Sequence, residues 1–299
     1  MDKTTSGWIN GFIGVVIFSA SLPATRMAVM QFDPVFLTVA RAAIAGLLAL
    51  LLLLAFRERR PARADLVPLA IVTLGVVVGF PLLTALALQY VTSAHSMVFI
   101  GLLPLATAVF GVIRGGERPR PAFWLFSLAG SVAVAGFALM QGLSAGTGGG
   151  TGPVVVTSST GDLLMVAAII VCGLGYAEGA SLSRRLGGWQ VISWALVMAL
   201  PVMIVLAVVL MPQSFAGIAL PAWTGLAYVS SFSMLIGFVF WYRGLAQGGI
   251  AAVSQLQLLQ PFLGLALAAW LLHEPVTWEM LAVTVAVIAC VAGARRFAR

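Results

Sequence analysis

Residues 254–261, SQLQLLQP, place three glutamines and a proline inside an otherwise apolar run. At about 100° per residue in a helix, Ser254, Gln257, Gln260 and Pro261 fall within about 120° of one face. An amide that faces hydrocarbon costs several kcal/mol, so this face must contact protein or water. The pattern predicts the polar wall of a substrate-binding cavity, and the alternative is hydrogen bonding between helices.

Glu178 is a carboxylate well inside an apolar run, in the segment CGLGYAEGAS at 172–181. An ionisable group in a membrane-spanning segment is by default a functional candidate, here for binding a proton or a substrate ammonium group. Glu178 is also close in sequence to Arg184 and Arg185. An ion pair near the helix end is therefore the alternative interpretation.

Hydroxyl and aromatic side chains complete the candidate site. Ser233 is near the middle of its predicted helix. Ser21 lies 157 residues before Glu178, and the same offset relates the two halves of the chain, as described below. Tyr176 and Trp241 offer rings that pack an apolar substrate side chain. His95 is near the outer start of its helix, where it either lines the outer mouth or is a polar group satisfied by its neighbours.

Three other charged positions have a structural and a functional interpretation. Arg41 lies about two turns inside its predicted helix, where it either binds a substrate carboxylate or extends outward to helix-end carbonyls. Glu117 and Glu274 each end an apolar segment before a turn that contains proline. We expect both to cap the positive end of the next helix.

The composition decides the class of protein. Of the 299 residues, 61% are hydrophobic and 8% are charged, and the mean hydropathy is +1.09. Soluble proteins carry about 25% charged residues, so this chain is predicted to lie in lipid. Backbone amides in lipid must be satisfied within each segment, which predicts helices. Ten spans of about 20 residues are expected: 8–29, 34–56, 65–88, 91–113, 121–141, 161–183, 190–211, 221–242, 249–272 and 277–296.

The basic residues indicate topology. With both termini on one side, that side receives all 16 Lys and Arg residues except Arg26 and Arg41. The positive-inside rule then predicts cytoplasmic termini. This placement explains the net charge of +7 without a nucleic-acid partner. The two cysteines lie within spans, and neither a disulfide, a metal nor a cofactor is expected.

An internal repeat relates the two halves. At an offset of 157 residues, Pro104 matches Pro261 and Glu117 matches Glu274. Five spans per copy is an odd number, so the second copy enters the membrane from the opposite side, as in many secondary transporters. The predicted units are a first repeat at 1–141, a Gly/Ser/Thr-rich outer loop at 142–160 and a second repeat at 161–299.

Three segments resemble a known family. FDPVFLTVARAAIA at 32–45, residues 87–119, and RGLAQGGIAAVSQLQLLQPFLGLALAAWLLHEP at 243–275 are similar to the drug/metabolite transporter superfamily of EamA type. The resemblance covers nearly the whole chain and extends, more weakly, to bacterial amino-acid exporters of the YddG kind. It implies an all-α integral membrane protein with ten transmembrane helices, arranged as two inverted five-helix repeats around a central cavity. It also implies a bacterial inner (plasma) membrane location.

A secondary transporter is therefore the expected function. The predicted substrates are small metabolites, above all amino acids, exported by alternating access across the lipid bilayer. The resemblance leaves an exchanger of phosphorylated sugars or nucleotide sugars as the alternative. An intramembrane enzyme is not expected, because no His-Glu-x-x-His or Gly-x-Ser-x-Gly motif occurs. A passive channel would show rings of like charge or filter repeats.

Overall fold

The computed structural model describes residues 2–87, 90, 99–146, 159–272 and 278–298. The described residues form helices, turns and connecting segments, and no strand occurs among them. The first half of the chain contains α1 (Lys3–Ser19), α2 (Ser21–Val29), α3 (Pro34–Ala55), η1 (Arg63–Asp65), α4 (Leu66–Val72), η2 (Thr73–Gly79), α5 (Phe80–Ala87), α7 (Leu103–Gly115) and α8 (Pro121–Gly146).

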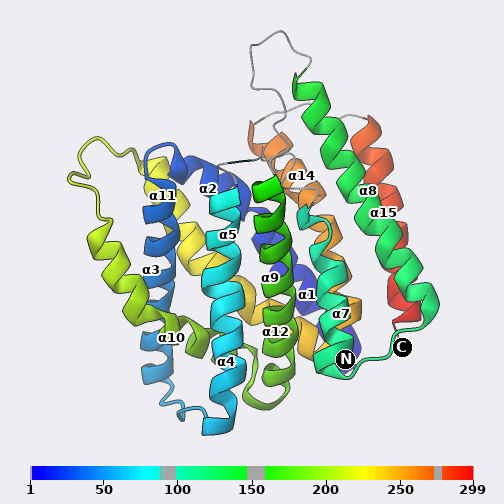
Figure 1. Ribbon diagram of the computed structural model, residues 1–299, viewed down its shortest axis with the longest axis horizontal. Helices are drawn as coiled ribbons and strands as arrows, with labels where there is room; N and C mark the ends of the chain where they lie inside the picture. Colours follow the sequence, from blue (N-terminus) through cyan, green and yellow to red (C-terminus); the bar gives the residue numbers. More distant parts are fainter. Residues whose placement is uncertain (1, 88–89, 91–98, 147–158, 273–277, 299) are drawn as a thin grey trace.

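The second half begins with a helix longer than the predicted span. It contains α9 (Ser159–Leu186), α10 (Gly188–Val209), α11 (Leu220–Tyr228), η3 (Val229–Ile236), α12 (Gly237–Gly248), α13 (Ile250–Ser254), η4 (Gln255–Leu259), α14 (Gln260–Leu272) and α15 (Trp278–Phe297). Both termini lie at the same end of the bundle, here called the termini side, and the opposite end is called the far side (Figure 1).

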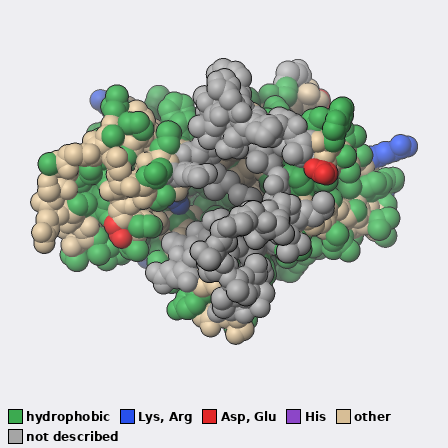
Figure 2. All heavy atoms as spheres, turned by 90° about the horizontal axis from the view of Figure 1, so that it is seen from above, with side chains coloured by type: hydrophobic (Ala, Val, Ile, Leu, Met, Phe, Trp, Pro, Cys, Tyr) green, Lys and Arg blue, Asp and Glu red, His purple; other side chains and the backbone are tan. Residues whose placement is uncertain are grey.

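Within the described ranges, five helical stretches are long and apolar enough to cross a membrane. Shorter apolar helices occupy Leu103–Gly115 and Pro121–Phe137. Figure 2, which looks onto the far side, shows many hydrophobic side chains and few charged ones on the part of this face that is coloured by type. The all-helical membrane class is thus confirmed, and the count of ten spans stays a prediction. The five long stretches are Pro34–Ala55, Arg63–Thr84, Ser159–Leu186, Gly188–Val209 and Leu220–Gly248.

The two halves run in opposite directions. In Figure 1, α1 rises from the termini side while α9 descends towards it, and α3 descends while α10 rises. A π-helical segment, η2 (Thr73–Gly79), interrupts the third of the ten predicted spans, and another, η3 (Val229–Ile236), interrupts the eighth. Their ends coincide at the 157-residue offset, since Gly79 corresponds to Ile236. The repeat therefore extends to a local distortion of the backbone.

Glycines allow equivalent helix pairs to approach closely. On one side of the bundle α1 packs along α12, and a Cβ on Gly7 would lie 2.3 Å from the backbone nitrogen of Gly248. On the other side α9 packs along α4, η2 and α5, where a Cβ on Gly75 would lie 2.3 Å from the carbonyl oxygen of Val171. Small residues at such contacts are the usual basis of helix packing in lipid.

Candidate functional site

The helix that carries the glutamines is interrupted. Residues Gln255–Leu259 form a 3₁₀ segment, η4, directly before Pro261. Proline cannot donate to the carbonyl of Gln257 one turn earlier, and the backbone N–H of Gln260 bonds that carbonyl instead. The irregular turn lies directly before Pro261, and it presents Gln257 towards α9.

Gln257 contacts Tyr176 from α9. Its Nε2 donates to the Tyr176 hydroxyl at 3.5 Å, a long and therefore weak hydrogen bond. The side-chain Oε1 is buried and has no hydrogen-bond partner within the described part of the chain. An unsatisfied buried amide oxygen costs about 1–3 kcal/mol, which favours a water or a ligand at this position.

Aromatic rings surround the pair. The Tyr176 ring meets Trp241 edge-on at 5.6 Å and Phe238 at 6.0 Å between ring centroids, and Phe18 meets Phe238 at 4.9 Å. Trp241 is fully buried, and its indole N–H has no acceptor among the described residues. We call Phe18, Tyr176, Phe238, Trp241 and Gln257 the aromatic–amide cluster. Its rings offer an apolar surface, and its free N–H and C=O groups offer polar contacts.

Ser21 and Ser233 form a second polar contact between helices, in addition to that of Gln257 with Tyr176. The Ser21 hydroxyl donates to Ser233 Oγ at 2.8 Å, joining the first and the eighth predicted spans. Both hydroxyls lie at irregular backbone, because α1 ends at Ser19 and Ser233 belongs to η3. Both residues are half-buried.

Other predicted residues are placed differently. Ser254 is fully buried, and its hydroxyl donates to the carbonyls of Ala251 at 2.9 Å and Pro104 at 3.3 Å, which is a contact between helices. Gln260 is half-buried at the start of α14. His95 lies outside the described residues. A role for each in substrate binding stays a prediction.

Glu178 is engaged in an ion pair. Its carboxylate accepts from Arg114 Nε at the end of α7, and Glu178 itself is buried. Neither sequence neighbour is its partner, because Arg185 pairs with Asp65 at 2.6 Å and Arg184 pairs with Glu117 at 3.1 Å. The structure favours the ion-pair interpretation. The partner is Arg114, 64 residues away in the chain, and no local sequence signal indicates it.

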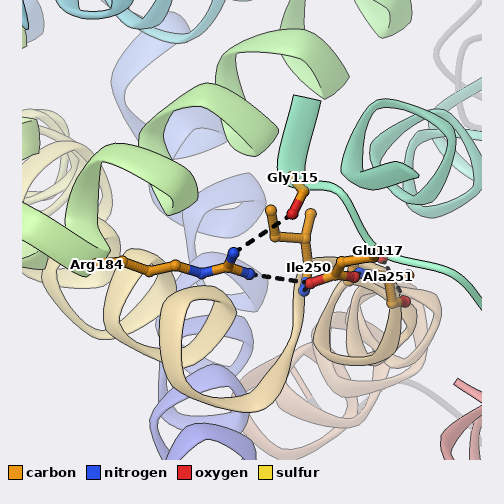
Figure 3. Close-up of polar contacts among 6 residues, drawn as sticks. Gly115, Glu117, Arg184, Ile250 and Ala251 are labelled. Atoms are coloured by element: carbon orange, nitrogen blue, oxygen red, sulfur yellow. Dashed lines mark hydrogen bonds and ion pairs between the residues drawn. The ribbon is translucent and has the colours of Figure 1, made fainter. Parts of the chain in front are cut away.

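Glu117 caps a helix, although not the one expected. Its two carboxylate oxygens accept the backbone N–H groups of Ile250 and Ala251, each at 2.7 Å, at the start of α13 (Figure 3). The expectation that it caps the next helix along the chain was therefore wrong. Gly116, in the left-handed region at φ 68°, ends α7 and turns the chain so that Glu117 faces the second half.

These contacts join the two halves of the chain at the termini side. Arg184 joins Glu117 to the Gly115 carbonyl, and Gly7 packs on Gly248, which precedes α13 by two residues. A cavity of about 300 Å³ opens beside them, lined by Glu117, Arg184 and residues 246–249 among others. A second, of about 310 Å³, lies beside Trp194 and Met198. Neither cavity includes Tyr176 or Gln257, so the central cavity stays a prediction.

Comparison with known proteins agrees with this architecture. A family model described as the EamA-like transporter family matches residues 5–139 and 159–295. A curated relative from Bacillus subtilis (strain 168), named "Uncharacterized transporter YdeK", is 69% identical over 299 residues, which is the full length of both chains. A solved crystal structure, 18% identical, superposes with a TM-score of 0.78 and covers 97% of this chain and 98% of its own. At that identity it supports the fold alone.

Proposed function

This chain belongs to the EamA-like transporter family, and from that premise we propose that it exports amino acids, including apolar and aromatic ones. It is a multi-pass membrane transporter, which is consistent with the expectation of no enzymatic activity. The observation that carries the proposal is the aromatic–amide cluster, where Gln257 Oε1 and the Trp241 indole N–H are buried without partners among the described residues.

The chemistry of the cluster matches an amino acid. The free amide oxygen of Gln257 accepts from an ammonium group, and the indole N–H of Trp241 donates to an oxygen atom of the substrate. The rings of Tyr176, Phe238 and Trp241 provide a surface for an apolar or aromatic side chain. Stacking surfaces tolerate different side chains, so we expect a broad range of substrates.

The proposed cycle is alternating access between the two halves. The positive-inside rule assigns the termini side to the cytoplasm of a bacterial inner (plasma) membrane. The ion pairs of Glu117 and Glu178 then hold the cytoplasmic side closed in this conformation. Export requires these pairs to open so that a substrate reaches the aromatic–amide cluster, and to re-form while the far side opens.

Flux through proteoliposomes tests this function. Vesicles that contain the purified chain and unlabelled leucine or phenylalanine should accumulate the labelled amino acid by exchange, with saturation and competition by other apolar amino acids. Vesicles without protein are the control. Exchange of sugar phosphates or nucleotide sugars without any amino-acid exchange would contradict the proposal and support the alternative.

A further inference from the structure

Arg41 is a half-buried cation that forms no ion pair with any described residue. It lies in α3, seven residues after Pro34, which places it about 10 Å from the far-side end of that helix. Its Nε is inaccessible and makes no hydrogen bond to any described residue. By contrast, the buried carboxylates Glu178 and Asp65 both have arginine partners.

The side chain is partly accessible. Arg41 as a whole is half-buried, while its Nε is inaccessible. Charged groups within membrane-spanning segments usually face the interior of the bundle or a water-filled space, and they commonly mark the path of a substrate or an ion.

The fold itself does not require this cation. The repeat places Met198 of α10 at the position equivalent to Arg41, and α3 and α10 pack against each other as equivalent helices. A neutral side chain therefore satisfies the packing there. An arginine that has no partner for its buried Nε among the described residues destabilises the protein, so the charge needs a reason outside the packing.

The helix that carries Arg41 packs against an irregular segment. This segment is η3, the π-helical stretch that carries Ser233 and its contact with Ser21. π-Helical segments occur frequently at functional sites. A guanidinium group binds anionic oxygen groups through charge-assisted hydrogen bonds.

We propose that Arg41 binds the anionic oxygen group of the transported molecule, a carboxylate in the case of an amino acid. The proposal rests on the proposed transport function for the identity of the ligand, and on the buried Nε of Arg41, which has no partner among the described residues, for the site. The headgroup of an anionic lipid offers the same chemistry, and the experiment below separates the two sources.

Binding to the purified full-length protein tests the site without transport. N-acetyl-leucine and N-acetyl-leucinamide differ only in the carboxylate, and their dissociation constants are measured by calorimetry in a neutral detergent. We expect the carboxylate to bind at least about tenfold more tightly, the effect of one charge-assisted hydrogen bond. This comparison needs no variant, so a folding defect cannot obscure it. Equal affinities would overturn the proposal.

Variants then assign the preference to Arg41. Arg41→Met copies the second repeat and should abolish the preference for the carboxylate, whereas Arg41→Lys should retain part of it. Arg243→Gln removes an exposed arginine and should leave the preference unchanged. A preference that survives Arg41→Met would refute the assignment. Stabilisation by phosphatidylglycerol that depends on Arg41, and that N-acetyl-leucine does not displace, would assign the site to lipid and overturn the proposal.

The transport assay separates the two proposals. Amino-acid exchange that Arg41→Met leaves intact, with competition by leucine and leucinamide unaltered, would refute the role of Arg41 and leave the transport function standing. Binding of N-acetyl-leucine that depends on Arg41, in a protein that exchanges no amino acid, would confirm the anion site and refute the proposed substrate.

Discussion

Glu117 of the first half of the chain accepts the backbone N–H of Ile250 in the second half at 2.7 Å, at the start of α13. Its other carboxylate oxygen accepts from Ala251, and Arg184 pairs with the same side chain. One carboxylate thus links the loop after α7 to two helices of the other repeat. Opening the termini side requires this link to break.

Removing the Glu117 carboxylate should loosen the start of α13. Loss of a helix cap costs about 1 kcal/mol, so Glu117→Ala should raise hydrogen exchange at the amides of Ile250 and Ala251 about fivefold. Glu117→Gln, which keeps one acceptor oxygen, should have a smaller effect. Exchange measured by mass spectrometry on peptides from this region checks the prediction. Glu279→Gln, exposed in the first turn of α15, is the control. Unchanged exchange in Glu117→Ala would contradict it.

The glutamines of the interrupted helix should affect transport rather than folding. Gln257→Leu removes the unpartnered amide oxygen and the contact to Tyr176, and Gln260→Leu removes the next polar group on the same face. We expect each to lower amino-acid exchange, Gln257→Leu by about tenfold, with normal yield and monodispersity. Tyr176→Phe should have a smaller effect, about twofold, because its bond to Gln257 is long.

A matched amide away from the cluster serves as the control. Gln213 is exposed in the connection after α10, and Gln213→Leu should transport like the wild type. If both Gln257→Leu and Gln260→Leu also transport normally, this face of the helix does not bind the substrate.

Glu178 should act through its ion pair rather than by carrying a proton. Glu178→Gln leaves Arg114 without its counter-charge and should lower the stability by about 1–3 kcal/mol, seen as a lower Tm in detergent. The double variant Glu178→Gln/Arg114→Gln should recover part of that loss. The response of exchange to an imposed pH gradient should match that of the wild type. A stable Glu178→Gln protein that has lost only this response would identify Glu178 as the proton site.

Close helix packing at Gly75 should be sensitive to a single methyl group. In Gly75→Ala the new Cβ would lie 2.3 Å from the Val171 carbonyl oxygen, so α9 must move, at a cost of about 1–3 kcal/mol. Gly136→Ala in α8 is the matched control, because no atom lies within 4 Å of its Cβ. It should be neutral or slightly stabilising. The Tm of both variants is measured by thermal unfolding, and equal Tm values would contradict the prediction.

Much of the fold followed from the sequence. The membrane class and the helices depend on the chain's affinity for lipid and on the need to satisfy backbone hydrogen bonds there. These are properties of each segment alone. One boundary pair agrees closely, since the span predicted at 34–56 corresponds to the helix Pro34–Ala55, whereas α12 continues to Gly248, six residues past its predicted end. The resemblance to EamA-type transporters was confirmed by the family match.

The sequence by itself determined which segments enter the membrane and which residues are too polar to face lipid, because hydrophobic transfer and backbone hydrogen bonding act locally. Only the tertiary structure decided the partners: Arg114 for Glu178, the α13 amides for Glu117, Tyr176 for Gln257 and no partner for the Nε of Arg41 among the described residues. Each partner comes from packing between helices that lie far apart in the chain. Hydropathy measures how a residue interacts with its solvent, and it carries no information about which helix lies opposite.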